Sequence, residues 1–523
     1  MKKTLSLILC VLLLASLGSA ALAEEAPITF PYTGEEVVFS GFAYDGLDQN
    51  PEQPGMQAWQ EHIGNMRVEY EFIAYTDYLE KAKILLATGD IPDVLPINKV
   101  MDVVSQYGSS GILLDFNEYL DYMPNLKAYL ETYPNMDYVC DAEGHRYAIM
   151  GVQPLDKSGE SWFANWDVLR AAGIEEAPET MDELLEAMRA VKAYDPTIIP
   201  FQSYWNIDYT MGWMARASLG QDYHEGSLVY YDTETGEYQF AYRGESAEAR
   251  REIVELMRTL YAEGLINSEI ATMSFEQELA TLASGKWAFT ALYRNTPEME
   301  AFKVEPGESL PFDIQPMLPP KAADGNRYMN IAYQHDGLPD WGIVCSADTE
   351  HPELLAAYMD QVVSPFGRDN FNYGVEGVTF DYVDGLPVAR EGVDTTGYTK
   401  TQYEVWMVGM GMPVETDSGY ILGDQAMHMN VDAFVSGEQQ AIFTPVFTTF
   451  SADAAAEKSS LENDLTTYIK ENEAAFIYGQ RDIAEWDAFL EELESIADID
   501  ALLELYNEAD TIVRNPERVF VVE

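Results

Sequence analysis

The sequence predicts an α/β protein with two or more lobes, and two observations support this fold class. First, predicted strands at residues 36–43, 67–74 and 93–97 alternate with predicted helices at 57–64 and 77–88. Such alternation is typical of a largely parallel sheet whose strands are joined by right-handed helical crossovers. Second, a chain of 523 residues is too long for one hydrophobic core and is expected to divide into lobes.

The passage around Gly89 illustrates the local signals that define these elements. Thr76 is predicted to cap the N-terminus of a helix, with Asp77 favourably placed in the first turn. Gly89 suits the position that follows a helix, where a positive φ is required, and Pro92 prevents the helix from continuing. The short apolar run at 94–97 then predicts a buried strand. The apolar face of the helix, at helical spacing, consists of Tyr78, Leu79, Ala82, Leu85 and Leu86.

The N-terminal residues have the pattern of a secretory signal peptide, spanning 1–23. Lys2 and Lys3 precede an apolar run, and small residues ending in Ala23 follow. This order predicts cleavage near Ala23 and a secreted mature chain that begins near Glu24, at the extracellular face of the cell envelope. The apolar run is too short to span a bilayer of roughly 30 Å, and no later stretch supplies the ~18 uninterrupted apolar residues of a membrane helix.

The charge of the chain excludes some classes of partner. There are 89 acidic and 30 basic residues, which give a formal net charge of −59. Such a charge repels nucleic acids and anionic membrane surfaces. It also disfavours a polyanionic ligand, although a local basic pocket can override the net charge. Aromatic residues make up 12% of the chain, which argues against a disordered protein.

The three cysteines have different expected roles. Cys10 lies inside the N-terminal apolar run, so a lipid anchor at this position is not expected. Cys140 and Cys345 belong to the mature chain. Secretion permits a disulfide between them, but the sequence leaves open the alternative of two buried thiols.

Several short motifs occur in the order found in one known family. Residues 87–94 have the sequence Ala-Thr-Gly-Asp-Ile-Pro-Asp-Val, and an Asn-x-Asp-x-Leu-x-x-x-Gly element spans 165–173. Tyr-Gly-Val-Glu-Gly follows at 373–377, and Phe-Ile-Tyr-Gly and Trp-Asp-Ala-Phe follow at 476–479 and 486–489. In this order the motifs resemble those of extracellular solute-binding protein family 1, the receptors that deliver substrates, mostly sugars, to ABC importers.

This resemblance implies a two-lobed fold of the type II periplasmic-binding-protein class. Each lobe is expected to hold a mostly parallel sheet flanked by helices, with a hinge between the lobes and extra helices at the C-terminus. The family pattern predicts one lobe from residues 24–153 and 288–340, and the other from residues 154–287 and 341–523. Some relatives carry a calcium-binding, aspartate-rich loop, but residues 194–200 lack a spaced series of oxygen ligands, and we expect no calcium there.

The resemblance also implies binding rather than catalysis. We expect the protein to capture a carbohydrate, in particular an oligosaccharide, by closure of its lobes. We expect it to act with ABC-transporter permease subunits, as a monomer, and without a metal or other cofactor. The sequence contains none of the common hydrolase or phosphate-binding motifs, and its six histidines lack zinc-site spacing. Two alternatives stay open: the same fold binding a peptide or another small solute, and a secreted glycoside-active enzyme.

Candidate ligand-binding residues follow from where strands end and from the chemistry of sugars. Ligands of open α/β sheets bind beyond the carboxyl ends of the strands. Aromatic rings pack against the C–H faces of sugars, and polar side chains pair with the hydroxyl groups. The alternative for each aromatic residue is ordinary packing in a core, and for Arg294 it is an ion pair in a very acidic chain. The candidates are Tyr44, Asp45, Tyr75, Asn98, Trp162, Asn165, Trp205, Trp213, Tyr293, Arg294, His335 and Glu376.

Overall fold

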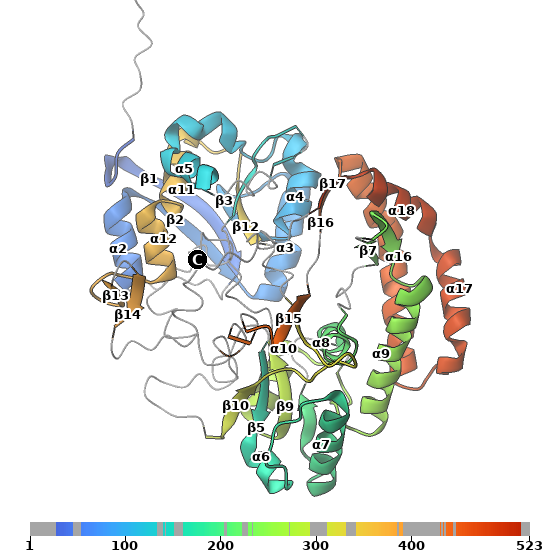
Figure 1. Cartoon of the computed structure of the whole chain (residues 1–523). Coiled ribbons are helices and arrows are strands. Elements are labelled where there is room, and N and C mark those ends of the chain that lie inside the picture. The colour runs from blue at the N-terminus through green and yellow to red at the C-terminus, as the bar shows by residue number, and fades with distance from the viewer. Residues whose placement is uncertain are drawn as a thin grey trace, which may run out of the picture.

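The computed structural model contains two lobes, each with its own sheet and its own hydrophobic core (Figure 1). The predicted signal peptide lies outside the residues that the structure describes. Within those residues, no helix is long and apolar enough to cross a membrane. The described residues are 28–44, 54–132, 140–141, 143–150, 161–202, 207–221, 228–232, 234–270, 272–292, 311–330, 341–383, 386–390, 429, 432–433, 436–442 and 446–513.

The first lobe is built on a five-stranded sheet with the order β2-β1-β3-β12-β4. β1 runs parallel to β2 and β3, whereas β12 is antiparallel to β3 and β4. β3 is buried along almost its whole length, as expected for the central strand of a sheet covered on both faces. The strands are β1 (Tyr32–Tyr44), β2 (Gly64–Ile73), β3 (Val94–Asn98), β4 (Ala148–Ile149) and β12 (Trp341–Cys345).

Helices cover this sheet and complete its core. Trp59 on α2 donates a hydrogen bond from its indole nitrogen to the Tyr358 hydroxyl on α11 over 3.1 Å, and the two rings meet edge to face. This contact ties the beginning of the lobe to the segment that returns to it late in the chain. The helices are α2 (Pro54–Ile63), α3 (Tyr75–Thr88), α4 (Val100–Tyr107), α5 (Pro124–Thr132), α11 (Pro352–Val362) and α12 (Pro365–Asn372), with a 3-10 helix η3 (Phe116–Tyr122).

α3 agrees with the predicted helix at 77–88 at its end but not at its start. Gly89 follows the helix with a φ of 74°, in the left-handed region, as predicted. The capping prediction for Thr76 is wrong, because the helix begins at Tyr75 and Ala74 precedes it without a side-chain cap. Only Ala74 separates α3 from β2, and this short connection leaves no room for a separate capping turn.

The second lobe is built on a four-stranded sheet with the order β10-β5-β9-β6. β5 is antiparallel to β10 and β9, and β6 is parallel to β9. β9 is buried at every position, which makes it the centre of this core. The strands are β5 (Ser161–Asn165), β6 (Ile199–Gln202), β9 (Trp287–Leu292) and β10 (Ile314–Met317). The helices around them are α6 (Trp166–Ala171), α7 (Met181–Tyr194), α8 (Ile207–Leu219), α9 (Gly244–Ala262) and α10 (Phe275–Ala283).

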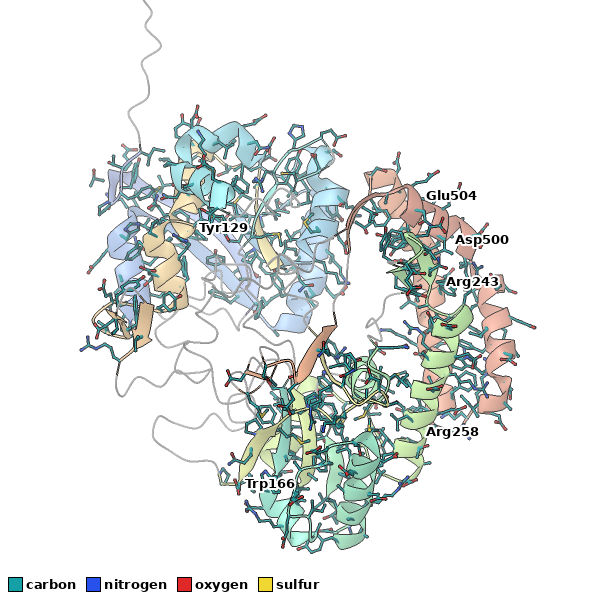
Figure 2. All side chains as sticks on the ribbon, viewed as in Figure 1. Tyr129, Trp166, Arg243, Arg258, Asp500 and Glu504 are labelled. Atoms are coloured by element: carbon teal, nitrogen blue, oxygen red, sulfur yellow. The ribbon has the colours of Figure 1, made fainter. Side chains whose placement is uncertain are left out.

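Helices near the C-terminus belong to the second lobe, in agreement with the prediction of extra C-terminal helices. Trp486 and Phe489 pack together in its core. Arg243, just before α9, donates hydrogen bonds to Glu494 of α17 and to Asp500 of α18, each over 2.8 Å (Figure 2). α16 also contacts α4 of the first lobe. These helices are α16 (Ala452–Ile477), α17 (Trp486–Ile496) and α18 (Ile499–Glu508).

Pairs of short strands lie outside the two main sheets. Three of the pairs are antiparallel, and β11 with β15 is parallel. β11 and β15 lie more than a hundred residues apart in the chain, so their pairing joins distant segments. The pairs are β7 (Val229–Asp232) with β8 (Glu237–Phe240), β11 (Arg327–Asn330) with β15 (Gln439–Ile442), β13 (Phe380–Val383) with β14 (Leu386–Ala389), and β16 (Val446–Thr449) with β17 (Asp510–Val513).

The division of the chain between the lobes differs from the predicted one. The prediction assigns residues 288–340 to one lobe with the N-terminal part, and residues 341–523 to the other. In the structure, β9 and β10 pair with β5 in the second sheet, whereas β12 pairs with β3 in the first. Strand pairing depends on which strands a segment meets in the folded chain, and these apolar strands suit either sheet. The first lobe therefore contains the described residues of 28–150 and 341–390, and the second those of 161–330 and 436–513.

Among the described residues, Cys140 and Cys345 are not joined by a disulfide. Cys140 is partly exposed and Cys345 is buried in β12. The structure thus has no Cys140–Cys345 bridge where the sequence left the choice open. Burial raises the pKa of the Cys345 thiol well above its ordinary value, and the group stays protonated and inert.

Candidate functional site

The chain passes between the lobes at one border of each sheet. This border is formed by the ends of the strands and not by an outermost strand. The chain leaves the first lobe after Met150, at the end of β4, and returns to it at Trp341, the start of β12. β3 ends at the same edge, because Asn98 lies opposite Trp341 in the antiparallel pair. β1 ends there as well, since it is parallel to β3. We call this the linking edge of the first sheet.

The second sheet has a corresponding linking edge. The chain arrives there at Ser161, the first residue of β5, which lies opposite Leu292 at the end of β9. Gln202, the last residue of β6, lies beside Thr290 of β9. β6 and β9 therefore end together at the edge that faces the connections to the first lobe, which is where an open sheet binds ligands.

Tyr44 and Asn98 lie at the linking edge of the first sheet, as predicted from their strand-terminal positions. The Tyr44 ring is buried, and its centroid lies 5.8 Å from that of Tyr78 on α3. The Tyr78 hydroxyl in turn donates to the Pro96 carbonyl, which fixes this aromatic pair against β3. Asn98 is only partly buried, and ligand contact by its side-chain amide stays a prediction.

Trp162 and Trp213 lie in the core of the second lobe. Trp162 on β5 is 1% exposed, and its ring centroid lies 5.5 Å from that of Phe201 on β6. Trp213 on α8 is also 1% exposed, with its centroid 6.3 Å from that of Tyr209. Their burial supports the packing alternative for both residues, whereas ligand contact by either stays a prediction.

Asn165 lies at the end of β5 that is remote from the linking edge. Four residue steps separate it from Ser161, or about 13 Å along an extended strand. The Asn165 side-chain amide donates to the Gly285 carbonyl over 3.0 Å, and its oxygen accepts from the Val168 backbone N–H at the start of α6. The structure therefore gives Asn165 a role in holding the second lobe together, which a motif match alone does not reveal.

The remaining candidates are only partly described. Glu376 is exposed in the turn that precedes β13. Tyr75 begins α3, but its side chain is outside the described part of the structure. Asp45 and Tyr293 directly follow β1 and β9, the strands that end at the two linking edges. Five candidates fall outside the described residues and stay predictions: Asp45, Trp205, Tyr293, Arg294 and His335.

Sequence reasoning missed three polar residues at the linking edge of the second sheet. Ser161, Gln202 and Thr290 are all buried there. The Thr290 hydroxyl donates to the Gln202 backbone carbonyl over 2.9 Å. The sequence does hold one signal for these residues. Thr290 is a polar residue within the otherwise apolar strand Trp-Ala-Phe-Thr-Ala-Leu. Because buried polar groups require defined partners, such a residue indicates a specific polar contact at that position.

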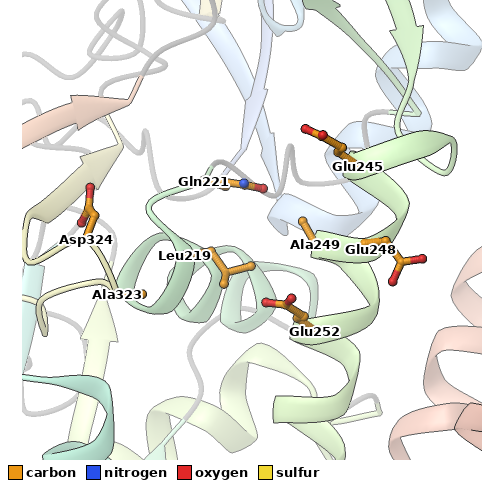
Figure 3. A pocket seen from close by; sticks show the side chains of 8 residues that line it. All are labelled: Leu219, Gln221, Glu245, Glu248, Ala249, Glu252, Ala323 and Asp324. Carbon is orange, nitrogen blue, oxygen red and sulfur yellow. The ribbon is translucent and has the colours of Figure 1, made fainter.

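An acidic hollow of about 360 Å³ lies between the end of α8, the start of α9 and the turn before β11 (Figure 3). Asp324 in this turn accepts hydrogen bonds from the Tyr328 hydroxyl and from Asn326, which lower the pKa of its carboxyl. Carboxylates accept hydrogen bonds from hydroxyl groups but repel anions. The lining residues are Leu219, Gln221, Glu245, Glu248, Ala249, Glu252, Ala323 and Asp324.

The described residues offer no arrangement of three His, Cys, Asp or Glu side chains that could hold a metal ion. The segment 194–200 runs from the last residue of α7 through a turn to the first residues of β6. Asp195 accepts hydrogen bonds there from the backbone N–H and the hydroxyl of Thr197, each over 2.8 Å. The carboxylate of Asp195 therefore closes a turn.

Comparison with known proteins places the chain in a family. The sequence model described as bacterial extracellular solute-binding protein matches residues 46–367. The chain belongs to this family. It is similar to the fructooligosaccharide ABC transporter substrate-binding protein FusA of Streptococcus pneumoniae serotype 4, with 24% identity over 326 residues, covering 58% of this chain and 56% of that protein. It is also similar to the melibiose/raffinose/stachyose-binding protein MelE of Bacillus subtilis, with 24% identity over 238 residues, or 45% and 50% of the two chains. These matches span about half the length of the curated relatives.

Solved structures extend the similarity over most of the chain. The alginate-binding protein AlgQ2 without calcium matches with a TM-score of 0.73 and 20% identity, covering 92% of this chain and 99% of that one. FusA of S. pneumoniae in complex with kestose matches with a TM-score of 0.70 and 18% identity, covering 90% and 98%. At this identity the likeness establishes the fold. It confirms the predicted two-lobed fold, and the match of the family model confirms the family resemblance.

Proposed function

We propose that this chain is the substrate-binding protein of an ABC importer and that it captures an oligosaccharide between its lobes. One structural observation carries the proposal. Each lobe has its own sheet and core, and strands of both sheets end at the edges where the chain passes between the lobes. The names of the relatives FusA and MelE, which refer to fructooligosaccharide and to melibiose, raffinose and stachyose, support the class of ligand.

Binding by closure follows from this architecture. Two lobes with separate cores, joined by a few chain segments, rotate about those segments. A ligand favours the closed form only through contacts that the open form lacks. Asn98 provides amide groups from the first lobe. Residues after β6 and β9, including Trp205 and Arg294, provide an aromatic face and a hydrogen-bond donor from the second.

The ligand in this proposal is a neutral oligosaccharide. A net charge of −59 and an acidic hollow beside α8 and α9 disfavour an anionic ligand such as a uronate polymer. The likeness to an alginate-binding protein does not oppose this, because at 20% identity it concerns the fold. The proposal further includes secretion through the predicted signal peptide, action as a monomer, and docking to the permease subunits of the importer.

The test is calorimetric titration of the mature chain with 1-kestose, raffinose, an alginate trisaccharide and a tripeptide. We expect binding of a neutral sugar, an increase in melting temperature by mass action, and a smaller radius of gyration in X-ray scattering. Binding of the tripeptide alone would favour the same fold with a peptide ligand. Release of smaller sugars, detected by chromatography of the recovered ligand, would instead establish a glycoside-active enzyme.

A further inference from the structure

Lys99 has an unusual backbone conformation at the linking edge of the first sheet. It directly follows Asn98, the last residue of β3, and precedes α4. Its φ is 51° and its ψ 46°, in the left-handed region. Among the described residues, every other positive φ belongs to a glycine. A side chain in this conformation is disfavoured because its Cβ approaches the backbone, and glycine is the ordinary choice.

The charge of Lys99 is also poorly placed for stability. Lys99 occupies the position before the first turn of α4, where the helix dipole presents a partial positive charge and repels a cation. Its side chain is exposed, and within the described structure its ammonium group forms no hydrogen bond or ion pair. By contrast, Lys81 and Lys127 of the same lobe pair with Glu71 and Asp121 over 2.7 and 2.9 Å. Among the described residues, Lys99 thus has no side-chain hydrogen bond or ion pair that offsets its unfavourable conformation and charge.

Lys99 lies at the linking edge of the first sheet. Asn98 lies opposite Trp341, the residue at which the chain returns from the second lobe, so Lys99 lies next to a connection between the lobes. Strained residues persist where surrounding structure holds them, and they concentrate at functional sites. A lysine ammonium carries three hydrogen-bond donors, which suit the ring and hydroxyl oxygens of a sugar.

We propose that Lys99 is a ligand-contacting residue that donates hydrogen bonds from its ammonium group to oxygens of the bound oligosaccharide. This inference rests on the proposed function. It adds Lys99 to the candidate ligand-binding residues. The sequence analysis, which chose residues at strand ends and aromatic residues, did not include it. It also explains why a lysine occupies a backbone position that suits glycine: the side chain serves binding at the expense of stability.

The test uses two substitutions and one matched control. Lys99→Gly removes the side chain and suits the left-handed backbone, whereas Lys99→Ala removes the side chain and keeps the unfavourable conformation. The control is Lys286→Ala, because Lys286 is also exposed but precedes Trp287 at the end of β9 remote from the linking edge. All three variants lose one positive charge. Affinity for 1-kestose and raffinose is measured by calorimetry, and melting temperature is measured without ligand.

We expect Lys99→Gly and Lys99→Ala to weaken binding of the sugar at least tenfold, and Lys286→Ala to leave it within about twofold of the wild type. Without ligand, Lys99→Gly should melt about 1–3 °C higher than the wild type and higher than Lys99→Ala. Unchanged affinity in both Lys99 variants would overturn the inference while leaving the proposed function intact. A lower melting temperature of Lys99→Gly would indicate a structural role and would overturn it too. If the wild type binds neither these sugars nor another oligosaccharide, the proposed function and the inference fail together.

Discussion

Asp360 is a buried carboxylate in the first lobe, and we expect its replacement by asparagine to change how stability depends on pH. Asp360 on α11 is 1% exposed. Its carboxylate oxygens accept hydrogen bonds from the Leu126 backbone N–H over 2.8 Å and from the Asn125 side-chain amide over 2.7 Å. These bonds tie α11 to the first turn of α5, where backbone N–H groups lack partners within the helix.

Loss of solvation outweighs these hydrogen bonds and raises the pKa of the Asp360 carboxyl to about 6, from an ordinary 3.8. Above pH 6 the group is charged in the folded and the unfolded chain, and folding carries the cost of burying that charge. Between pH 6 and 3.8 the folded chain takes up the proton first, so stability rises as the pH falls. The pKa difference corresponds to about 3 kcal/mol in total, and roughly half of this is recovered on going from pH 7.5 to pH 5.0.

The comparison of wild type with Asp360→Asn isolates this effect from the general charge of the chain. Asparagine does not titrate, keeps an acceptor for the Leu126 N–H, and can pair with Asn125 if that amide turns to present its oxygen. The free energy of unfolding is measured by urea denaturation at both pH values. Relative to the variant, the wild type should gain about 1–2 kcal/mol at the lower pH.

The matched control is Asp464→Asn on α16, because Asp464 is an exposed aspartate and its replacement removes the same charge without burial. We expect no comparable change between the two pH values for this variant. The reasoning is refuted if the difference between wild type and Asp360→Asn is the same at pH 7.5 and pH 5.0, or if the wild type loses stability relative to the variant at pH 5.0.

Three further predictions concern the packing of each lobe, and urea denaturation measures the first two. Gly89→Ala places a Cβ at a φ of 74°, 3.2 Å from the Ile112 side chain, and should cost about 1–2 kcal/mol; an unchanged midpoint would mean that α3 does not end as described. Trp59→Phe removes the donor to the Tyr358 hydroxyl and part of a buried ring, and should cost at least about 1–2 kcal/mol; an unchanged free energy of unfolding would contradict the packing described. Trp486→Ala leaves a cavity in the second core and should cost about 3–5 kcal/mol, with faster proteolysis of the C-terminal helices; equal proteolysis rates would argue that these helices fold apart from the lobe.

Several features of the protein follow from the sequence by itself. The end of α3 at Gly89 and the buried strand β3 were predictable, because a helix end and a short apolar strand depend on residues close together in the chain. The two-lobed fold was predictable from the order of motifs such as residues 87–94 and 165–173. Tyr44 and Asn98 were placed correctly at strand ends, since the alternation of strands and helices indicates where the carboxyl ends of a parallel sheet lie.

Tertiary structure alone decided which sheet each late strand joins and what several side chains do. β9 and β12 are both short and apolar, and their sequences do not indicate which of the two sheets each joins. Asn165 matches a motif, yet its amide is used by Gly285 and Val168, which only the packed lobe brings to it. The left-handed backbone of Lys99 is likewise invisible in a sequence. Pairing and burial depend on contacts between residues far apart in the chain, whereas periodicity and capping signals act over a few residues.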